Sequence, residues 1–148
     1  MSNVYLALYK GRKKNGGVKG SIYRFFDWLI RTSTKGQFSH SELVIDVGAG
    51  YYDCYSSSNR DGGVRIKRMK LPSSKWQLVK LDIKADTVEA YYQKTKSQKY
   101  DLFGAISSTI PFYQSKERQF CSEWCFNAIT GKDSGWRFSP NDLYEIYK

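Results

Sequence analysis

The sequence has no apolar run that approaches the roughly 20 residues of a membrane span. Its first residues, MSNVYLALYKGRKK, place a few apolar residues before the charged ones, which is the reverse of a signal peptide. Three cysteines are an odd number, so a complete disulfide framework is excluded and a reducing compartment fits better. The glycine pairs lack the Lys-Ser/Thr of a phosphate loop, which leaves nucleotide hydrolysis without support. We therefore expect a soluble protein made in a cytoplasm.

Acidic residues are in short supply, because 14 Asp and Glu stand against 24 Lys and Arg and leave a net charge of +10. Such an excess concentrates anions, whether nucleic acid, lipid headgroups or anionic wall polymers, and it also favours solubility. The basic residues are scattered through GRKKNGG, RIKRMK and QKTKSQK, and none of these stretches interleaves aromatics as a nucleic-acid motif does. We expect an anionic peptide or lipid as substrate and no specific nucleic-acid partner.

Linkers, repeats and low-complexity tracts are also missing, and 148 residues with 41% hydrophobic content are enough for one core. We expect a single domain, residues 1–148, of the α+β class. Strand-like runs occur at 4–9, 39–47, 51–57, 64–70 and 76–81, and Gly48-Ala49-Gly50 predicts a hairpin between the second and third. These strands should form an antiparallel meander packed against helices.

Helical spacing of apolar residues predicts helices that begin at Ser21, at Asp86 and at Cys121, and a further short helix over 102–110. The helix that begins at Cys121 should end at Gly131. A last short helix should follow the string SPND at 139–142, which has an N-cap serine, a proline at the first helical position and an acid three residues after the cap.

Cys121 is the strongest candidate nucleophile, because it falls in the first turn of the helix predicted in FCSEWCFNAIT. A thiol is a strong nucleophile only as thiolate, and a helix N-terminus and an imidazole partner are the usual means of lowering its pKa. The single histidine, His40 in FSHSELVI, begins a predicted strand and is the one candidate base. Cys125, one turn further along, and Cys54, on a strand among tyrosines, are expected in the core. A cysteine on a helix that faces a histidine on a strand is the arrangement of papain.

Three strings, SHSELVI, YDLFG at 100–104 and FCSEW, occur in an order in which histidine precedes cysteine. In this order and spacing they resemble the circularly permuted branch of the NlpC-type papain-like thiol hydrolases, which includes the YaeF and YiiX proteins and lecithin:retinol acyltransferase. The segments VYLALYKG, SSSNRDGGVRIKRMKLP and FSPNDLYEIY are similar to small phage-encoded members. The resemblance implies a papain-like fold in permuted order, with Cys121 as nucleophile and His40 as base. We expect no cofactor or metal, and we expect the protein in the cytoplasm of a bacterial or phage-infected cell.

A third polar group should orient the imidazole and stabilise its charged form. Glu42 is two residues beyond His40, which on a strand puts both side chains on one face. Across the hairpin, one of residues 55–57 should lie opposite His40, with Asp53 displaced toward the turn. Relatives of the permuted type often place the third residue on that second strand. We expect Glu42 in this role, with Ser56 and Asp53 as alternatives.

The oxyanion of a tetrahedral intermediate needs preorganised donors, and backbone N–H groups at the start of the Cys121 helix are suitably placed. Tyr100 in YDLFG is a further candidate donor, and a buried tyrosine that anchors the next helix is the alternative for it. A zinc site is an alternative of a different class, since His40, Cys54, Cys121 and Cys125 have the composition of a structural zinc centre. The lack of a close cysteine pair on a turn argues against zinc.

Together these residues predict a cysteine hydrolase that cleaves an amide bond, with a thioester at Cys121 that is resolved by water activated by His40. The resemblance makes a peptide, in particular one from a bacterial cell wall, the leading substrate. A lipid ester hydrolase or an acyltransferase of the lecithin:retinol acyltransferase type is the alternative. A non-enzymatic basic binding protein is the third reading.

Overall fold

The computed structural model describes residues 2–11, 36–58, 60–100 and 118–148 of the chain. Its centre is an antiparallel sheet in the order β5-β1-β2-β3-β4, formed by Val4–Tyr9 (β1), His40–Gly48 (β2), Tyr51–Ser58 (β3), Gly63–Lys70 (β4) and Trp76–Leu81 (β5). Two short strands, Lys99–Tyr100 (β6) and Arg118–Gln119 (β7), extend the sheet beyond β4, and they pair with each other in parallel. The five main strands match the predicted ranges to within one residue at each end.

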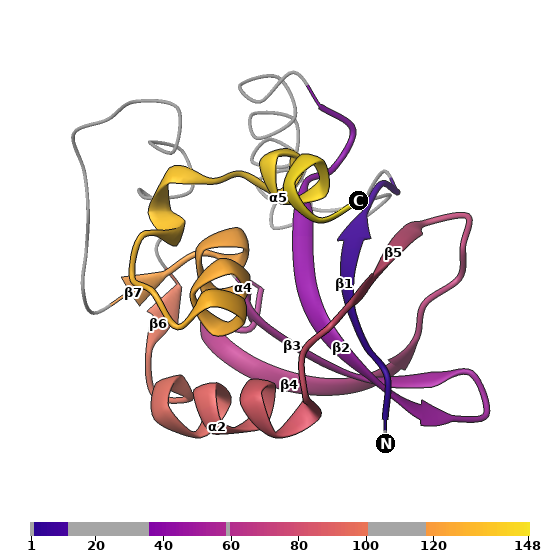
Figure 1. Ribbon diagram of the computed structural model, residues 1–148, viewed down its shortest axis with the longest axis horizontal. Coiled ribbons are helices and arrows are strands. Elements are labelled where there is room, and N and C mark those ends of the chain that lie inside the picture. The colour runs from indigo at the N-terminus through magenta and orange to yellow at the C-terminus, as the bar shows by residue number, and fades with distance from the viewer. Residues whose placement is uncertain (1, 12–35, 59, 101–117) are drawn as a thin grey trace.

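The helices of the described part of the chain are Ala85–Thr95 (α2), Cys121–Thr130 (α4) and Pro140–Tyr147 (α5), with the short 3-10 helix Gly135–Arg137 (η1) between the last two (Figure 1). The predicted N-cap of α5 is present, because the Ser139 hydroxyl accepts the Asp142 N–H at 3.2 Å. α4 ends at Gly131, whose φ of 68° lies in the left-handed region that glycine adopts without strain. Sheet and helices in one unit confirm the α+β class.

The fifth strand departs from the predicted meander. β1 to β4 are consecutive neighbours, but β5 pairs along its length with β1 and not with β4. An edge-to-face contact between the rings of Tyr9 and Trp76, at 5.1 Å between centroids, accompanies this pairing. The outer edge of β4 is taken instead by β6, where Gly63 is needed because a Cβ there would collide with the carbonyl oxygen of Gln98. The prediction was wrong for β5 because pairing between distant segments is not encoded in the local alternation of either strand.

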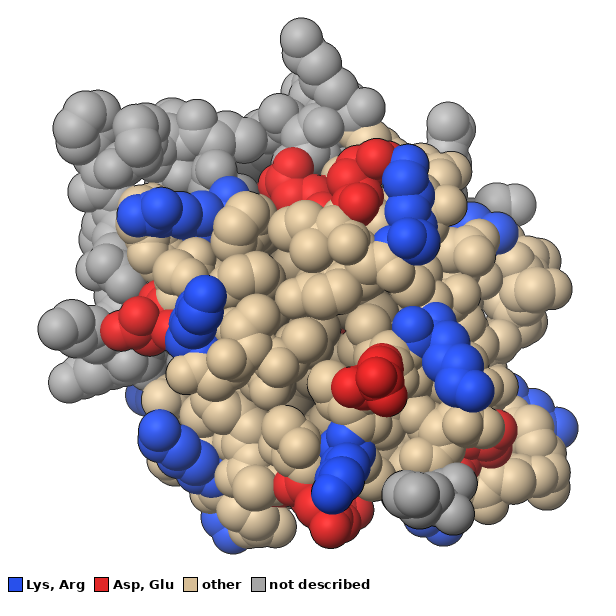
Figure 2. Space-filling view, in the orientation of Figure 1, with Lys and Arg blue, Asp and Glu red and all other residues tan. Residues whose placement is uncertain are grey.

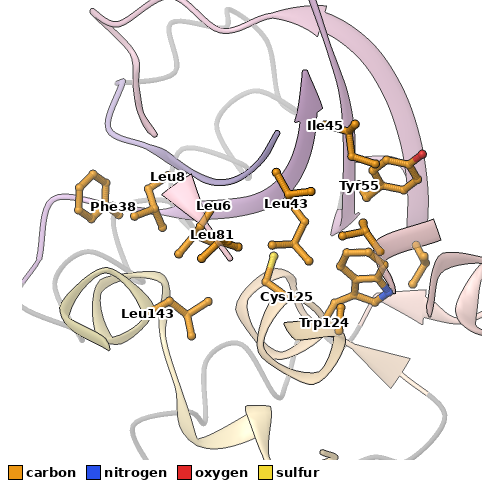
Figure 3. Packing of buried hydrophobic residues seen from close by; sticks show 14 residues of the cluster. Leu6, Leu8, Phe38, Leu43, Ile45, Tyr55, Leu81, Trp124, Cys125 and Leu143 are labelled. Carbon is orange, nitrogen blue, oxygen red and sulfur yellow. The ribbon is translucent and has the colours of Figure 1, made fainter. Parts of the chain in front are cut away.

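Alternation along the strands divides the apolar side chains between the two faces of the sheet. The larger cluster lies between the sheet and the helices (Figure 3), and its members include Leu6, Leu8, Leu43, Ile45, Tyr55, Trp124, Cys125 and Leu143. The smaller cluster is built on Ala7, Val44, Cys54 and Leu71. In Figure 3 the sulfur of Cys125 points from α4 toward the sheet, so α4 packs directly against the strands that carry the candidate base.

Charged side chains are spread over the surface seen in Figure 2, where Lys and Arg occur singly and are interspersed with Asp and Glu. The basic excess is therefore not gathered into one continuous patch on this face. Across the described residues, no helix has both the length and the apolar composition needed to cross a membrane.

Candidate active site

The backbone places Cys121 at the N-terminal end of α4. Phe120 precedes the helix in an extended conformation, and its carbonyl accepts the first helical hydrogen bond from Trp124 N–H at 2.9 Å. The Trp124 indole donates to the Thr95 hydroxyl of α2 at 2.8 Å, which fixes how α4 is rotated about its axis. N–H groups in the first turn of a helix have no helical acceptor and create a positive potential there. The Cys121 thiol therefore lies where a negative charge is favoured.

His40 is the first residue of β2, and α5 fixes the segment that leads into this strand. Phe38 N–H donates to Asn141 Oδ1 at 3.0 Å, and Asn141 Nδ2 donates back to the Phe38 carbonyl at 2.9 Å. The His40 ring lies edge-on to Trp76 of β5, with 6.4 Å between ring centroids, and 18% of its side chain is exposed. The direction of the imidazole is thus set by elements from three parts of the chain.

Cys121 and His40 meet where α4 packs on β2, close enough that each side chain shifts the pKa of the other. Burial would raise the pKa of the Cys121 thiol, but the charge and nearness of His40 and the polar groups of Ser41 outweigh burial and lower that pKa. Burial also opposes a charged imidazole, yet Cys121 and then Glu42 raise the pKa of His40 from 6.5 to about 9. Opposite shifts of this kind favour a thiolate and imidazolium pair.

Ser41 contributes to the same pair from the other face of β2. Its hydroxyl is buried and has no hydrogen-bond partner in the described part of the chain. Ser41 lies close enough to Cys121 to lower the pKa of that thiol, after the larger effects of burial and His40. Ser41 therefore adds polar groups beside the sulfur that favour a thiolate.

Glu42 lies on the same face of β2 as His40, and its Oε1 is 2.9 Å from His40 Nε2. With Nε2 turned to the carboxylate, Nδ1 is the ring nitrogen left for Cys121. Glu42 is only 1% exposed, and burial would raise its pKa, but Arg65 and then His40 lower it to about 2. The carboxylate is therefore a fixed negative charge beside the imidazole.

Arg65 of β4 contacts both oxygens of Glu42, with Nη2 2.6 Å from Oε1 and Nη1 2.9 Å from Oε2. Its Nη1 also donates to the Cys54 carbonyl at 3.1 Å, and its Nε donates to Asp61 Oδ2 at 2.9 Å. Asp61 in turn accepts from Lys67 Nζ at 2.6 Å. Burial would lower the pKa of Arg65, but hydrogen bonds to Glu42 and Asp61 raise it, so the guanidinium stays charged.

The register of the hairpin differs from the prediction. Leu43 pairs with Tyr55, and the same pairing continued toward the start of β2 puts Ser58 opposite His40. The expectation that one of residues 55–57 lies opposite the histidine is therefore wrong by at least one position. A bulge in β2 close to the turn shifts the register, and this extra residue has no recognisable signal in the alternation of the strand.

The two alternatives to Glu42 have other partners. The Ser56 hydroxyl donates to the carbonyl of Ser41 at 2.7 Å. Asp53 is displaced toward the turn, as predicted, and its two oxygens accept from Arg68 at 2.7 and 2.8 Å. Of the three candidates, Glu42 is the one whose carboxylate lies within hydrogen-bond distance of the imidazole.

The expected oxyanion donors are only partly described. The first turn of α4 offers the backbone N–H groups of Cys121 and Ser122, and the Ser122 hydroxyl is turned away to the Phe138 carbonyl at 2.7 Å. Tyr100 belongs to β6, but its hydroxyl is outside the described residues, so its role stays a prediction. The helices predicted from Ser21 and over 102–110 also lie outside the described residues.

The four residues of the zinc alternative do not converge in the structure. Cys125 belongs to the cluster between sheet and helices, whereas Cys54 belongs to the cluster on the opposite face of the sheet. Among the described residues, no group of three or more His, Cys, Asp and Glu side chains is placed to hold a metal ion.

Sequence reasoning missed Arg65, Asp61 and Ser41. The string GVRIKRMK carried a usable signal, because its alternation puts Arg65 on the face opposite to Ile66. Arg65 pairs with Ser56, whose small side chain on the intervening strand leaves room for an arginine to reach β2. Such a contact across two strands depends on the register, which the sequence did not predict.

Comparison of this chain with families of proteins, with curated proteins and with solved structures found no match.

Proposed function

We propose that this protein is a cysteine hydrolase that cleaves an amide bond, papain-like in permuted order. The observation that carries the proposal is the contact of Cys121 with His40 and of His40 with Glu42. A thiol of lowered pKa at a helix N-terminus, an imidazole and a carboxylate on the other ring nitrogen are the groups that acyl transfer requires. The chain order also supports it, since the strand with His40 precedes the helix with Cys121.

The reaction begins when the Cys121 thiolate attacks the carbonyl carbon of the amide, and the C=O electron pair moves onto oxygen. N–H groups of the first turn of α4 donate to this oxyanion. The C–N bond then breaks, His40 gives its proton to the leaving amine, and the acyl group remains on Cys121 as a thioester.

Water resolves the thioester in the second half of the reaction. Neutral His40 takes a proton from water, the oxygen attacks the carbonyl carbon, and the C–S bond breaks to return Cys121 as thiolate. The acyl group leaves as a carboxylic acid. Glu42 stays negative throughout and stabilises the imidazolium each time it forms.

The resemblance to the permuted NlpC branch makes a peptide from a bacterial cell wall the leading substrate. Such wall polymers are anionic, and the net charge of +10 would favour their approach.

The test is to trap the acyl-enzyme. The protein is incubated with a panel of wall peptides and short-chain phospholipids, quenched in acid, and mapped by mass spectrometry for acylated cysteines. We expect a peptidyl adduct on Cys121 and release of an amine, both lost in Cys121→Ala and retained in the matched control Cys125→Ala. A fatty-acyl adduct on Cys121 would move the assignment to lipid ester hydrolysis or acyl transfer. Turnover of no substrate, or turnover that survives Cys121→Ala, would contradict the proposal.

A further inference from the structure

The Arg65 guanidinium is largely buried and is held by several hydrogen bonds at once. It binds both oxygens of Glu42, the Cys54 carbonyl and one oxygen of Asp61, all within 3.1 Å. The Arg65 side chain is only 14% exposed. A planar fork that makes these contacts at once is specific to arginine, because the compact ammonium of lysine has a different donor geometry.

The register of β2, β3 and β4 brings Arg65 within reach of Glu42. Arg65 on β4 pairs with Ser56 on β3, and the register of the hairpin continued by one residue places Ser56 beside Glu42 on β2. Ser56 is fully buried, and its hydroxyl is engaged with the Ser41 carbonyl. The small serine on the middle strand leaves a path above the sheet along which Arg65 reaches Glu42.

The charges along this path alternate in sign. Cys121 as thiolate meets His40, His40 meets Glu42, Glu42 meets Arg65, and Arg65 meets Asp61. Lys67 ends the row at the surface, where it binds Asp61. Each charge between the two ends of this row therefore lies between charges of opposite sign, which is the arrangement that offsets the cost of burying ions.

Without Arg65, the buried thiolate, imidazolium and Glu42 carboxylate would carry one uncompensated negative charge. A proton on the thiol or on Glu42 would remove that charge. In the described part of the chain, the pair also faces Trp76 of β5, which carries no charge, Ser41, and Cys125, whose pKa burial and the charge of Cys121 raise well above its ordinary value. Arg65 and His40 both lower the pKa of Glu42, and burial raises the pKa of Cys54 beside them. Because the charge of His40 is balanced by the thiolate, Arg65 supplies the charge that neutralises Glu42.

We propose that Arg65 is a positioning residue of the candidate site, which holds the Glu42 carboxylate against His40 and is itself held by Asp61. The inference rests on the proposed function and adds to it a residue that touches neither the substrate nor the thiol. Its effect on Cys121 passes through Glu42.

The test is the pH dependence of Cys121 alkylation by iodoacetamide, with each rate divided by its own alkaline plateau so that access to the thiol cancels. In Arg65→Met we expect the acid limb of the profile to move up by at least about one pH unit, which makes alkylation on that limb about tenfold slower. The matched control is Arg68→Met, because Arg68 lies on the same strand and also donates to both oxygens of one carboxylate, that of Asp53, but is exposed. Its profile should coincide with that of the parent.

A double variant shows whether the effect passes through Glu42. In Glu42→Gln with Arg65→Met both members of the buried ion pair are gone, so the acid limb should return to within a fraction of a pH unit of the Glu42→Gln single variant. The same double variant also covers the case in which Arg65→Met alone fails to fold, because removing one partner of a buried pair is more damaging than removing both. Recovery of folding in the double variant would then support the proposal.

Two results would overturn the inference. A folded Arg65→Met variant with the profile of the parent would remove Arg65 from the site while leaving the proposed function standing. An equal shift from Arg65→Met in the parent and in the Glu42→Gln background would show that Arg65 acts on the thiol directly and not through Glu42. A parent protein whose Cys121 reacts only at alkaline pH would instead contradict the proposed function itself.

Discussion

Cys121 and Cys125 lie one turn apart on α4, and both are buried, yet their pKa values move in opposite directions. For Cys125, burial and then the negative charge of Cys121 raise the pKa well above its ordinary value. For Cys121, burial acts in the same sense but is outweighed by His40 and Ser41. Burial alone therefore yields an inert thiol, and only the imidazole partner and the first-turn position distinguish the candidate nucleophile from its neighbour.

Cys54 supports the same comparison from a different element. It lies on β3 and is fully buried, and burial followed by the charge of Glu42 raises its pKa. The pKa values of Cys54 and Cys125 are therefore both raised, although Cys54 lies on a strand and Cys125 on a helix. Being on a helix or on a strand does not by itself lower the pKa of a buried thiol.

The largest expected effect comes from His40→Ala, which should make Cys121 resemble Cys125. Without the imidazolium, the pKa of Cys121 should return to or above the ordinary value of about 8.5, at which only about 1% of a thiol is ionised at pH 6.5. Alkylation of Cys121 at that pH should therefore fall by about a hundredfold. The measurement is the rate of carboxamidomethylation at Cys121 by mass spectrometry. A rate within a few fold of the parent would show that the helix N-terminus lowers this pKa without His40.

The next effect is on the acid stability of the fold. The pKa of Glu42 is lowered from 4.5 to about 2, so its contribution is fully present above pH 4.5 and is lost as the pH falls toward 2. The shift corresponds to roughly 3 kcal/mol in the free energy of unfolding. Urea unfolding from pH 6 to pH 2 should show this loss in the parent and a flatter pH dependence in Glu42→Gln. Identical slopes in the two proteins would mean that Glu42 is not held as a charged group.

A small effect on stability is expected from Cys125→Ala, which removes the buried thiol whose pKa is raised. Cys125 packs behind Cys121 in the main core, so the variant should lose about 1 kcal/mol in the free energy of unfolding. The pH profile of Cys121 alkylation should keep its shape. A shift of more than about one pH unit in that profile would show that the second thiol takes part in ionising the first.

Much of the fold was predictable because its signals are local. Alternation located the five main strands, and Ser139 and Gly131 marked a helix start and a helix end. The neighbour of β5 was not predictable, because the edge of β1 and the edge of β4 look equally suitable from their own residues. The sequence therefore predicted elements better than it predicted their pairing.

The candidate site was also predictable where its signals are local and not where they depend on strand pairing. The spacing of His40 and Glu42 on one strand was enough to place both on the same face, and their contact is present. The alternatives Ser56 and Asp53 have other partners, because Ser56 donates to the Ser41 carbonyl and Asp53 accepts from Arg68. Arg65 reaches Glu42 across an intervening strand, a contact that only a known register reveals.

The three cysteines differ, in this account, because His40 holds Cys121 as a thiolate while the other two thiols stay protonated. This difference is measured by the alkylation rate of all three cysteines in one folded sample, followed by peptide mapping from pH 4 to pH 10. We predict that the midpoint for Cys121 lies well below the ordinary thiol pKa of about 8.5, and that Cys54 and Cys125 react only above it. Coincident midpoints for the three cysteines would contradict the account.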